Sequence, residues 1–261
     1  MKIFVINLDK STDRLSHMAH QLNRLGYAWE RFPAVGPSQI EDMSRTLEMP
    51  VLHGACTTPE KAVALSHYTI WKKVLAEGID HALVLEDDVH FCRDARTLVE
   101  SIEDEISRGL CYDIIKVETF LAGIFVDREG LHLLARTRLH RLRSNHAGAG
   151  AYIISKEGCR KMIERYATSD RAVDLVLFDG DLEEMRVFQL HPAPCIQDML
   201  LSRGRTGIVS TVGAERSEKD HRPVWLDKLK SPLRGAYYAI QTMCAWNKGR
   251  VKIRSRYVDG I

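Results

Sequence analysis

Several features of secreted, membrane-spanning and zinc-binding proteins are missing from this chain of 261 residues. Its six cysteines are scattered, without the CxxC or CxxH spacing of a zinc site or the density of a disulfide framework. No apolar run approaches the roughly 18 residues of a membrane span, and the run in MKIFVINLDK is too short for a signal peptide. We therefore expect a cytoplasmic protein in a reducing compartment, with room for peripheral contact with the inner membrane.

A large excess of charge of one sign is also missing, because the net charge is only +2. The charge is unevenly distributed, however. Residues 221–261 carry nine Lys or Arg and two Asp, a local net charge of +7, which leaves −5 on the first 220 residues. We expect one main domain over residues 1–220 and a basic amphipathic tail over 221–261. Nucleic-acid binding is not expected, since no recognition motif accompanies the basic charge.

The tail contains apolar residues at helical spacing between clusters of Lys and Arg. These residues are Leu233, Ala236, Tyr237, Ile240, Met243 and Cys244. Two interpretations stay open. An amphipathic helix of this kind can lie on an anionic membrane, or it can pack on the domain as a terminal helix followed by a solvated basic end.

The first third of the chain has the pattern of a nucleotide-binding α/β layer. A buried strand is predicted over Lys2 to Leu8, a helix over Leu15 to Leu25 with Gly26 as its cap, and a second strand over Ala28 to Phe32. This β-α-β opening predicts a Rossmann-like mixed sheet flanked by helices. Pro33 to Pro50 is predicted as a loop or short helix.

Later elements continue the alternation of helices and strands. A helix is predicted from Thr57, where a capping Thr precedes Pro59 and Glu60, and it ends at Gly78. The other predicted elements are a helix over 98–106, strands over 112–117 and 148–155, an antiparallel excursion over 131–142 and a helix over 156–167 that Ser155 caps. Residues 173–178 and 187–197 are predicted as irregular, site-forming segments, and 202–220 as a mobile segment.

The most informative stretch is HALVLEDDVHF, residues 81–91, in which a short apolar run ends on three carboxylates. Such a run predicts a buried strand whose carboxyl end opens into a ligand crevice. Because successive side chains of an extended chain point to opposite sides, Glu86 and Asp88 can contact one ligand while Asp87 points away. Hard cations such as Mg²⁺ and Mn²⁺ prefer carboxylates together with phosphate oxygens. A solvated acidic turn is the alternative.

Four motifs in this order resemble glycosyltransferase family 25, which contains bacterial lipooligosaccharide galactosyltransferases and animal procollagen galactosyltransferases. The motifs are INLDKSTDR (6–14), ALSH (64–67), LVLEDDV (83–89) and GAGAYIIS (148–155). The resemblance covers about residues 1–200. It implies a GT-A type fold, a nucleotide-sugar donor that is usually UDP-galactose, a divalent cation and inversion at the anomeric carbon. The chain departs from the family at Ala62 and Val63, where Gly-Cys is common.

The resemblance also implies roles for the acidic motif. Glu86 and Asp88 are expected to hold Mn²⁺ or Mg²⁺, with Asp88 bound directly and Glu86 acting through water or the ribose. Asp87 is a candidate for the donor nucleotide. His191 could complete the metal shell, although a plain loop histidine is the alternative.

Further candidates for donor binding are Asn7 and Arg14, near the end of the first strand, together with His67 and Gln197. Arg14 could instead form a surface salt bridge with Asp9 or Asp13, and His67 could be structural.

The catalytic base is expected to be Asp174, since an inverting transfer needs a carboxylate near the acceptor hydroxyl. Asp170 and the run Asp179-Gly180-Asp181 are rivals.

These residues predict a metal-assisted transferase that moves a hexose from UDP-galactose to a saccharide of a lipooligosaccharide or lipopolysaccharide. Two other functions stay open. A nucleotidyltransferase would also use acids at a strand end, but it should carry a glycine-rich phosphate loop, and LDKSTDR contains no glycine. A catalytically silent sugar-nucleotide or glycan-binding module is the third interpretation.

Overall fold

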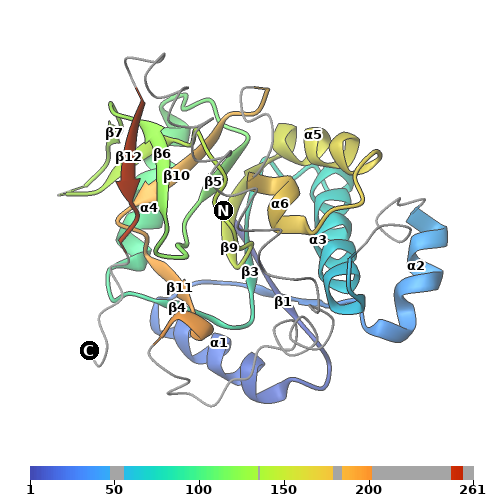
Figure 1. The fold of residues 1–261 in the computed structure, drawn as a ribbon. Coiled ribbons are helices and arrows are strands. Elements are labelled where there is room, and N and C mark those ends of the chain that lie inside the picture. The colour runs from blue at the N-terminus through green and yellow to red at the C-terminus, as the bar shows by residue number, and fades with distance from the viewer. Residues whose placement is uncertain (48–55, 135, 179–183, 202–247, 255–261) are drawn as a thin grey trace, which may run out of the picture.

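The computed structural model describes residues 1–47, 56–134, 136–178, 184–201 and 248–254 (Figure 1). A mixed eight-stranded sheet forms its centre, with helices on both faces. In spatial order the strands are β2 (Glu30–Pro33), β1 (Lys2–Asn7), β3 (His81–Glu86), β9 (Ala151–Ser155), β5 (Ile114–Lys116), β10 (Val187–His191), β8 (Arg138–Arg141) and β7 (Leu131–His132). The predicted α/β fold with a mixed sheet flanked by helices is confirmed.

Strand direction changes at β9, in the middle of the sheet. β1 runs parallel to both β2 and β3, as the β-α-β pattern predicts. β9 is antiparallel to its neighbours β3 and β5. Since Leu85 of β3 pairs with Ala151 of β9, the start of β9 lies beside the end of β3.

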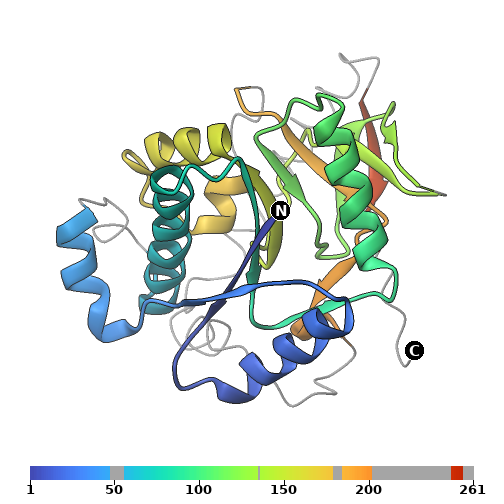
Figure 2. The same cartoon turned by 180° about the vertical axis from the view of Figure 1, so that it is seen from behind.

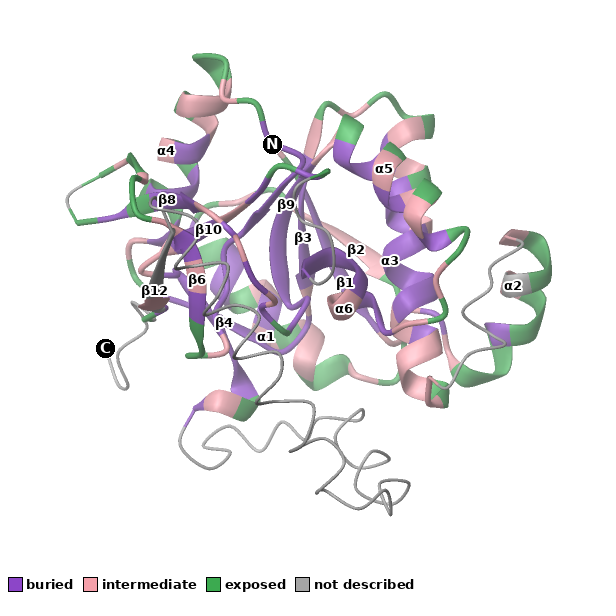
Figure 3. Cartoon of the chain, turned by 45° about the horizontal axis from the view of Figure 1, so that its top comes forward, coloured by how far each residue is buried: buried purple, intermediate pink, exposed green. Residues whose placement is uncertain are grey.

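Each face of the sheet packs against its own set of helices, because alternate residues of a strand point to opposite faces. Phe4 and Ile6 of β1 belong to the core shared with α3 (Thr58–Ala76), α5 (Lys156–Tyr166) and α6 (Val173–Phe178). Ile3 and Val5 belong to the core shared with α1 (Thr12–Arg24) and α4 (Ala95–Ser107). Figure 2 shows the second helical layer from behind, and Figure 3 shows the sheet as the buried centre of the chain.

Helix caps lie where the sequence predicts them. The Thr57 hydroxyl accepts a hydrogen bond from the Glu60 amide, and the Glu60 carboxylate accepts one from the Thr57 amide at 2.8 Å, so a capping box begins α3. Ser155 caps α5 through the Gly158 amide. The region predicted as a loop or short helix contains η1 (Pro37–Gln39) and α2 (Ile40–Leu47).

Two predicted irregular segments are regular structure, so those predictions are wrong. Residues 173–178 form α6, and residues 187–191 form β10 inside the central sheet. The sequence of β10 misleads because it carries Gln189, which is fully buried. Its amide donates to the carbonyls of Glu118 and Leu190, so a polar residue is satisfied within the core.

Two small sheets complete the fold. β4 (Val89–Phe91) pairs with β11 (Cys195–Gln197), which leads into η3 (Asp198–Leu200). β6 (Gly123–Asp127) pairs with β12 (Lys248–Lys252). β12 belongs to the predicted tail, yet it is a strand on the domain, and Ile253 after it is buried. The predicted tail helix over 233–244 and the predicted mobile segment over 202–220 lie outside the described residues.

A search of the described helices for a membrane span finds none with the length and apolarity to cross a bilayer.

Candidate active site

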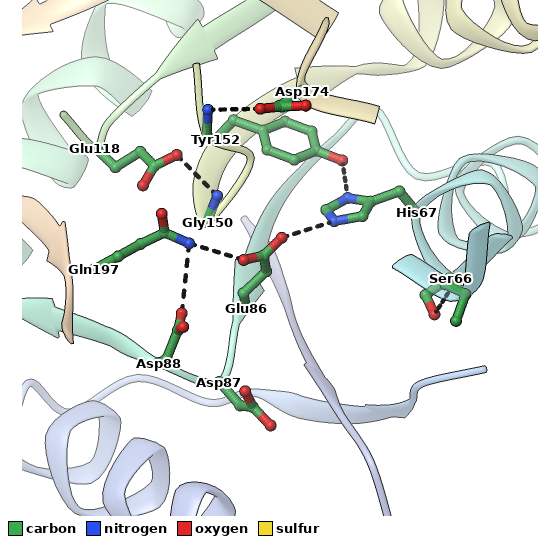
Figure 4. Close-up of polar contacts among 12 residues, drawn as sticks. Ser66, His67, Glu86, Asp87, Asp88, Glu118, Gly150, Tyr152, Asp174 and Gln197 are labelled. Carbon is green, nitrogen blue, oxygen red and sulfur yellow. Dashed lines mark hydrogen bonds and ion pairs between the residues drawn. The ribbon is translucent and has the colours of Figure 1, made fainter. Parts of the chain in front are cut away.

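A cavity of about 250 Å³ opens at the carboxyl ends of β1 and β3, where α/β sheets place their ligands. Seven of the nine predicted site residues line it, namely Asn7, Arg14, Glu86, Asp87, Asp88, Asp174 and Gln197. Figure 4 shows the side chains that converge around Glu86. The apolar side of the lining includes Val63.

Arg14 binds the acidic motif directly. Its Nη1 lies 2.9 Å from Oδ1 of Asp87, and its Nη2 lies 2.9 Å from Oδ2 of Asp88. Arg14 therefore belongs to the cavity, and the alternative of a surface pair with Asp9 or Asp13 is not what the structure shows.

Asp87 points away from Glu86 and Asp88, which share a partner in Gln197, as the alternation predicts, but it still lines the cavity and contacts Arg14 (Figure 4). β3 ends at Glu86, and residues 87–88 form a turn. Asn7 Nδ2 donates to Oδ2 of Asp87 at 2.7 Å. The end of β1 thus holds the acidic turn in place.

Gln197 lies between the other two carboxylates. Its Nε2 is 2.9 Å from Oε2 of Glu86 and 3.5 Å from Oδ1 of Asp88. A Cβ atom at Gly150 would come within 2.8 Å of this nitrogen, so only glycine leaves room for the amide. The glycine-rich entry into β9 therefore shapes the acidic site.

The cavity has an excess of negative charge. Arg14 is the one Lys or Arg among the described residues that line it, whereas five carboxylates do so, those of Glu60, Glu86, Asp87, Asp88 and Asp174. Burial, reinforced by Asp88, Asp87 and Asp174, raises the pKa of Glu86 to about 8. Burial also raises the pKa of Asp88, although Arg14 and Gln197 oppose the shift. Ionising all five carboxylates at once would therefore need a further positive charge in the cavity.

His67 lies behind Glu86 in a buried hydrogen-bonded chain (Figure 4). Its Nδ1 is 2.8 Å from the Tyr152 hydroxyl, and its Nε2 is 3.4 Å from Oε1 of Glu86. Trp71 donates its indole N–H to the same hydroxyl at 3.0 Å. Burial lowers the pKa of His67 to about 3, so the ring is neutral at working pH.

This chain favours one tautomer of His67. An indole nitrogen can only donate, so the Tyr152 hydroxyl accepts from Trp71 and keeps its own proton, which we expect it to donate to Nδ1 of His67. The remaining proton of the ring is then on Nε2, which faces Glu86. His67 does not line the cavity, so it acts on the site through Glu86.

The structure does not bring His191 to the acidic motif. It ends β10, its ring centroid lies 6.3 Å from that of His140, and it is not among the residues that line the cavity. This arrangement does not support its predicted part in a metal shell with Glu86 and Asp88, which stays a prediction. β10 is separated from β3 by β9 and β5, a neighbour relation that the sequence does not reveal.

Asp174 lines the cavity from the start of α6. Its Oδ2 accepts a hydrogen bond from the Gly148 amide at 3.2 Å, and its Oδ1 accepts one from the Leu175 amide at 2.9 Å. Its rival Asp170 is exposed and lies outside the lining. The run 179–181 lies outside the described residues.

A buried ion pair between Lys116 and Glu118, which was not predicted from the sequence, holds the backbone of Gly148 and Gly150. Lys116 Nζ lies 2.9 Å from Oε1 of Glu118, and both side chains are fully buried. Lys116 also donates to the Gly148 carbonyl, and Glu118 accepts from the Gly150 amide at 2.8 Å. The signal was available, since opposite charges two residues apart in an apolar strand lie on one face.

Glu86 and Asp88 fit a divalent cation in the chemistry of their donor atoms. Both offer carboxylate oxygens to a cavity with excess negative charge, and one amide already bridges them. Among the described residues no three His, Cys, Asp or Glu side chains could hold an ion by themselves. Mg²⁺ and Mn²⁺ sites of this kind usually take their other ligands from phosphates and water.

Comparisons with known proteins show which family this chain resembles. The family model described as glycosyltransferase family 25 (LPS biosynthesis protein) matches residues 1–177. The lacto-N-neotetraose biosynthesis glycosyltransferase LgtE of Neisseria meningitidis serogroup B is 31% identical over 212 residues, covering 76% of this chain and 75% of the relative. The lipooligosaccharide biosynthesis protein lic2B of Haemophilus influenzae is 26% identical over 202 residues, covering 75% of each chain. Among solved structures, A197 from STIV has a TM-score of 0.40 at 15% identity, covering 75% of this chain and 83% of that one.

Proposed function

The chain belongs to glycosyltransferase family 25, and on this premise we propose that it transfers galactose from UDP-galactose, with inversion, to a saccharide of a lipooligosaccharide or lipopolysaccharide. The observation that carries the proposal is the cavity at the ends of β1 and β3, where five carboxylates face one guanidinium. Such a site attracts a dication together with the diphosphate that the dication neutralises.

We assign the donor to the side of the cavity formed by the end of β1. Asn7 and Arg14 lie there and contact the acidic turn. We assign Arg14 to the diphosphate because it is the guanidinium in the lining, and we assign Gln197 and Glu86 to the adjoining wall.

Glu86 and Asp88 would hold Mn²⁺ or Mg²⁺ in this function. The bound ion would act as a Lewis acid that stabilises the departing UDP, an effect worth several kcal/mol in metal-dependent enzymes. The chain's own residues fix these carboxylates. Gln197 contacts both Glu86 and Asp88, and His67 contacts Glu86 from the buried side.

Asp174 is the proposed base. Its carboxylate takes the proton of the acceptor hydroxyl while the hydroxyl oxygen bonds to the anomeric carbon and the bond to UDP breaks. The amides of Gly148 and Leu175 hold the carboxylate in one orientation. Because the side chain is already ordered, less conformational entropy is lost when the reactive geometry forms.

The acceptor class is supported by the names of the relatives. LgtE is named for the biosynthesis of lacto-N-neotetraose, and lic2B for that of lipooligosaccharide. Peripheral membrane contact through residues 221–261 stays a prediction, because most of that segment lies outside the described residues.

A panel of UDP-sugars tests the proposal. UDP release should be fastest from UDP-galactose, should stop with EDTA and return with Mn²⁺, and should fall by about 10²- to 10⁴-fold with Asp174→Asn in the presence of acceptor. Asp170→Asn is the matched control and should keep wild-type activity. Turnover that is indifferent to EDTA and to Asp88→Asn would remove the metal from the proposal.

A further inference from the structure

Phe120 is the one aromatic residue among the described residues that line the cavity. It lies in the loop between β5 and β6, on the opposite side of the acidic motif from the end of β1, and its side chain is half-buried. The lining beside it is small and apolar, from Ala147 to Ala149, and Met199, 57% exposed, lies at the same cavity. This wall is chemically different from the charged one.

The ring of Phe120 packs on the same glycine that orients the proposed base. A Cβ atom at Gly148, whose φ is +88°, would lie 2.2 Å from Cε2 of Phe120, so the ring and the glycine backbone are in close contact. The Gly148 amide also donates to Asp174. Phe120 and Asp174 are therefore held next to each other by one residue.

The backbone around Phe120 is fixed in a costly conformation. Leu121 has a φ of 55°, the left-handed region that a leucine rarely adopts. Its amide donates to Thr119 Oγ1 at 2.9 Å, and Thr119 Oγ1 donates to the Ile253 carbonyl at 3.3 Å. The strained backbone at Leu121 lies beside the cavity and is held by these hydrogen bonds. Strain of this kind clusters at functional sites, which points to a function for the neighbouring Phe120.

A buried histidine fixes the amide of Phe120 itself. The amide donates to Nε2 of His146 at 3.3 Å, so Nδ1 carries the ring proton and donates to Oε1 of Gln189 at 2.7 Å. Burial lowers the pKa of His146 to about 3, which keeps Nε2 free to accept. The loop that carries Phe120 is thus tied to the core by hydrogen bonds at Thr119, Phe120 and Leu121.

We propose that Phe120 is the platform on which the terminal pyranose of the acceptor saccharide stacks, beside Asp174. A pyranose has one face made of C–H groups, which an aromatic ring covers well, while its hydroxyls reach polar groups around the rim. In this arrangement an acceptor hydroxyl lies at the proposed base. The inference rests on the proposed function and adds a subsite to it.

Saturation-transfer NMR with methyl β-D-galactopyranoside and methyl β-D-glucopyranoside tests this subsite, in the presence of UDP and Mn²⁺. Saturation should concentrate on the protons of one face of a sugar ring. It should fall about tenfold with Phe120→Leu and be retained with Phe120→Trp. Phe188→Leu, at a half-buried phenylalanine of β10 outside the cavity lining, is the matched control and should behave as wild type.

The outcomes separate this inference from the proposed function. Wild-type saturation with Phe120→Leu, or a loss of UDP affinity equal to the loss of saccharide affinity, would overturn the stacking role while UDP-sugar turnover continues. Absence of UDP-sugar turnover in the wild type would instead overturn the proposed function. If Phe120→Leu does not fold, the tryptophan fluorescence of Phe120→Trp provides the test. Its emission maximum should shift when the methyl glycosides are added. An unchanged emission spectrum would reject the stacking platform.

Discussion

The hydroxyl of Tyr152 lies 2.8 Å from Nδ1 of His67, and this contact determines which nitrogen of the ring faces Glu86. A residue of β9 thereby acts on a carboxylate of β3 through a side chain of α3. The site is held from behind by a chain of buried hydrogen bonds rather than by surface charge.

Replacing Tyr152 by Phe should remove the hydrogen bond that fixes the tautomer of His67. His67 loses the donor to Nδ1, and the Trp71 indole is left without its acceptor, so we expect a loss of about 1–3 kcal/mol in the free energy of unfolding. Long-range ¹⁵N–¹H spectra at neutral pH should show the Nε2–H tautomer of His67 in the wild type and a mixture in the variant. Tyr166→Phe is the control, since its hydroxyl bonds to the Arg171 carbonyl and not to His67. A pure Nε2–H tautomer in Tyr152→Phe would contradict the argument.

Binding of Mn²⁺ should depend on pH through Glu86. Its pKa is about 8 without metal, so below that pH the ion must displace a proton, and affinity should rise up to tenfold per pH unit before levelling off above pH 8. Glu86→Gln should bind Mn²⁺ more weakly and with a flatter pH dependence, measured by calorimetry with UDP present.

Glu60→Gln provides the control for this titration. Glu60 also lines the cavity, but its carboxylate belongs to the capping box of α3, and glutamine preserves that contact. Its pH dependence should match the wild type. An unchanged slope in Glu86→Gln would mean that another group carries the proton.

The Lys116–Glu118 pair should be costly to break from one side. Lys116→Met leaves a carboxylate without its counter-ion in the core, and we expect a loss of about 3–5 kcal/mol. The double variant Lys116→Met/Glu118→Gln should recover part of this loss, since an amide oxygen can still accept from Gly150. Urea unfolding measures both. Arg160→Met, which breaks an exposed pair with Glu157, should cost less than about 1 kcal/mol.

The sequence predicts those parts of the fold that depend on local signals. The β-α-β opening, the Thr57 cap and the Ser155 cap need only periodicity and capping chemistry, and all three are present. β10 was missed because its buried Gln189 is satisfied by partners distant in sequence, which no local pattern shows.

The candidate site was predictable to the same extent. Glu86, Asp88 and Arg14 lie in motifs whose strand ends meet at one edge of the sheet, and they converge as expected. His191 lies outside the cavity lining, and its place depends on the order of strands across the whole sheet, which no local pattern shows. Phe120 gave no signal, since an aromatic residue in a loop becomes informative only when its neighbours in space are known.

The reversal of β9 has a consequence for how such a site can evolve. In an all-parallel sheet every strand would offer its outgoing end to the ligand, but here an incoming end abuts Glu86, whose amide donates to the Gly150 carbonyl at 2.8 Å. The long excursion from residue 117 to residue 150 begins and finishes at that edge. Both ends of the excursion, which hold Glu118 and Gly150, are therefore tied to the acidic turn, and change is expected only in the part between them.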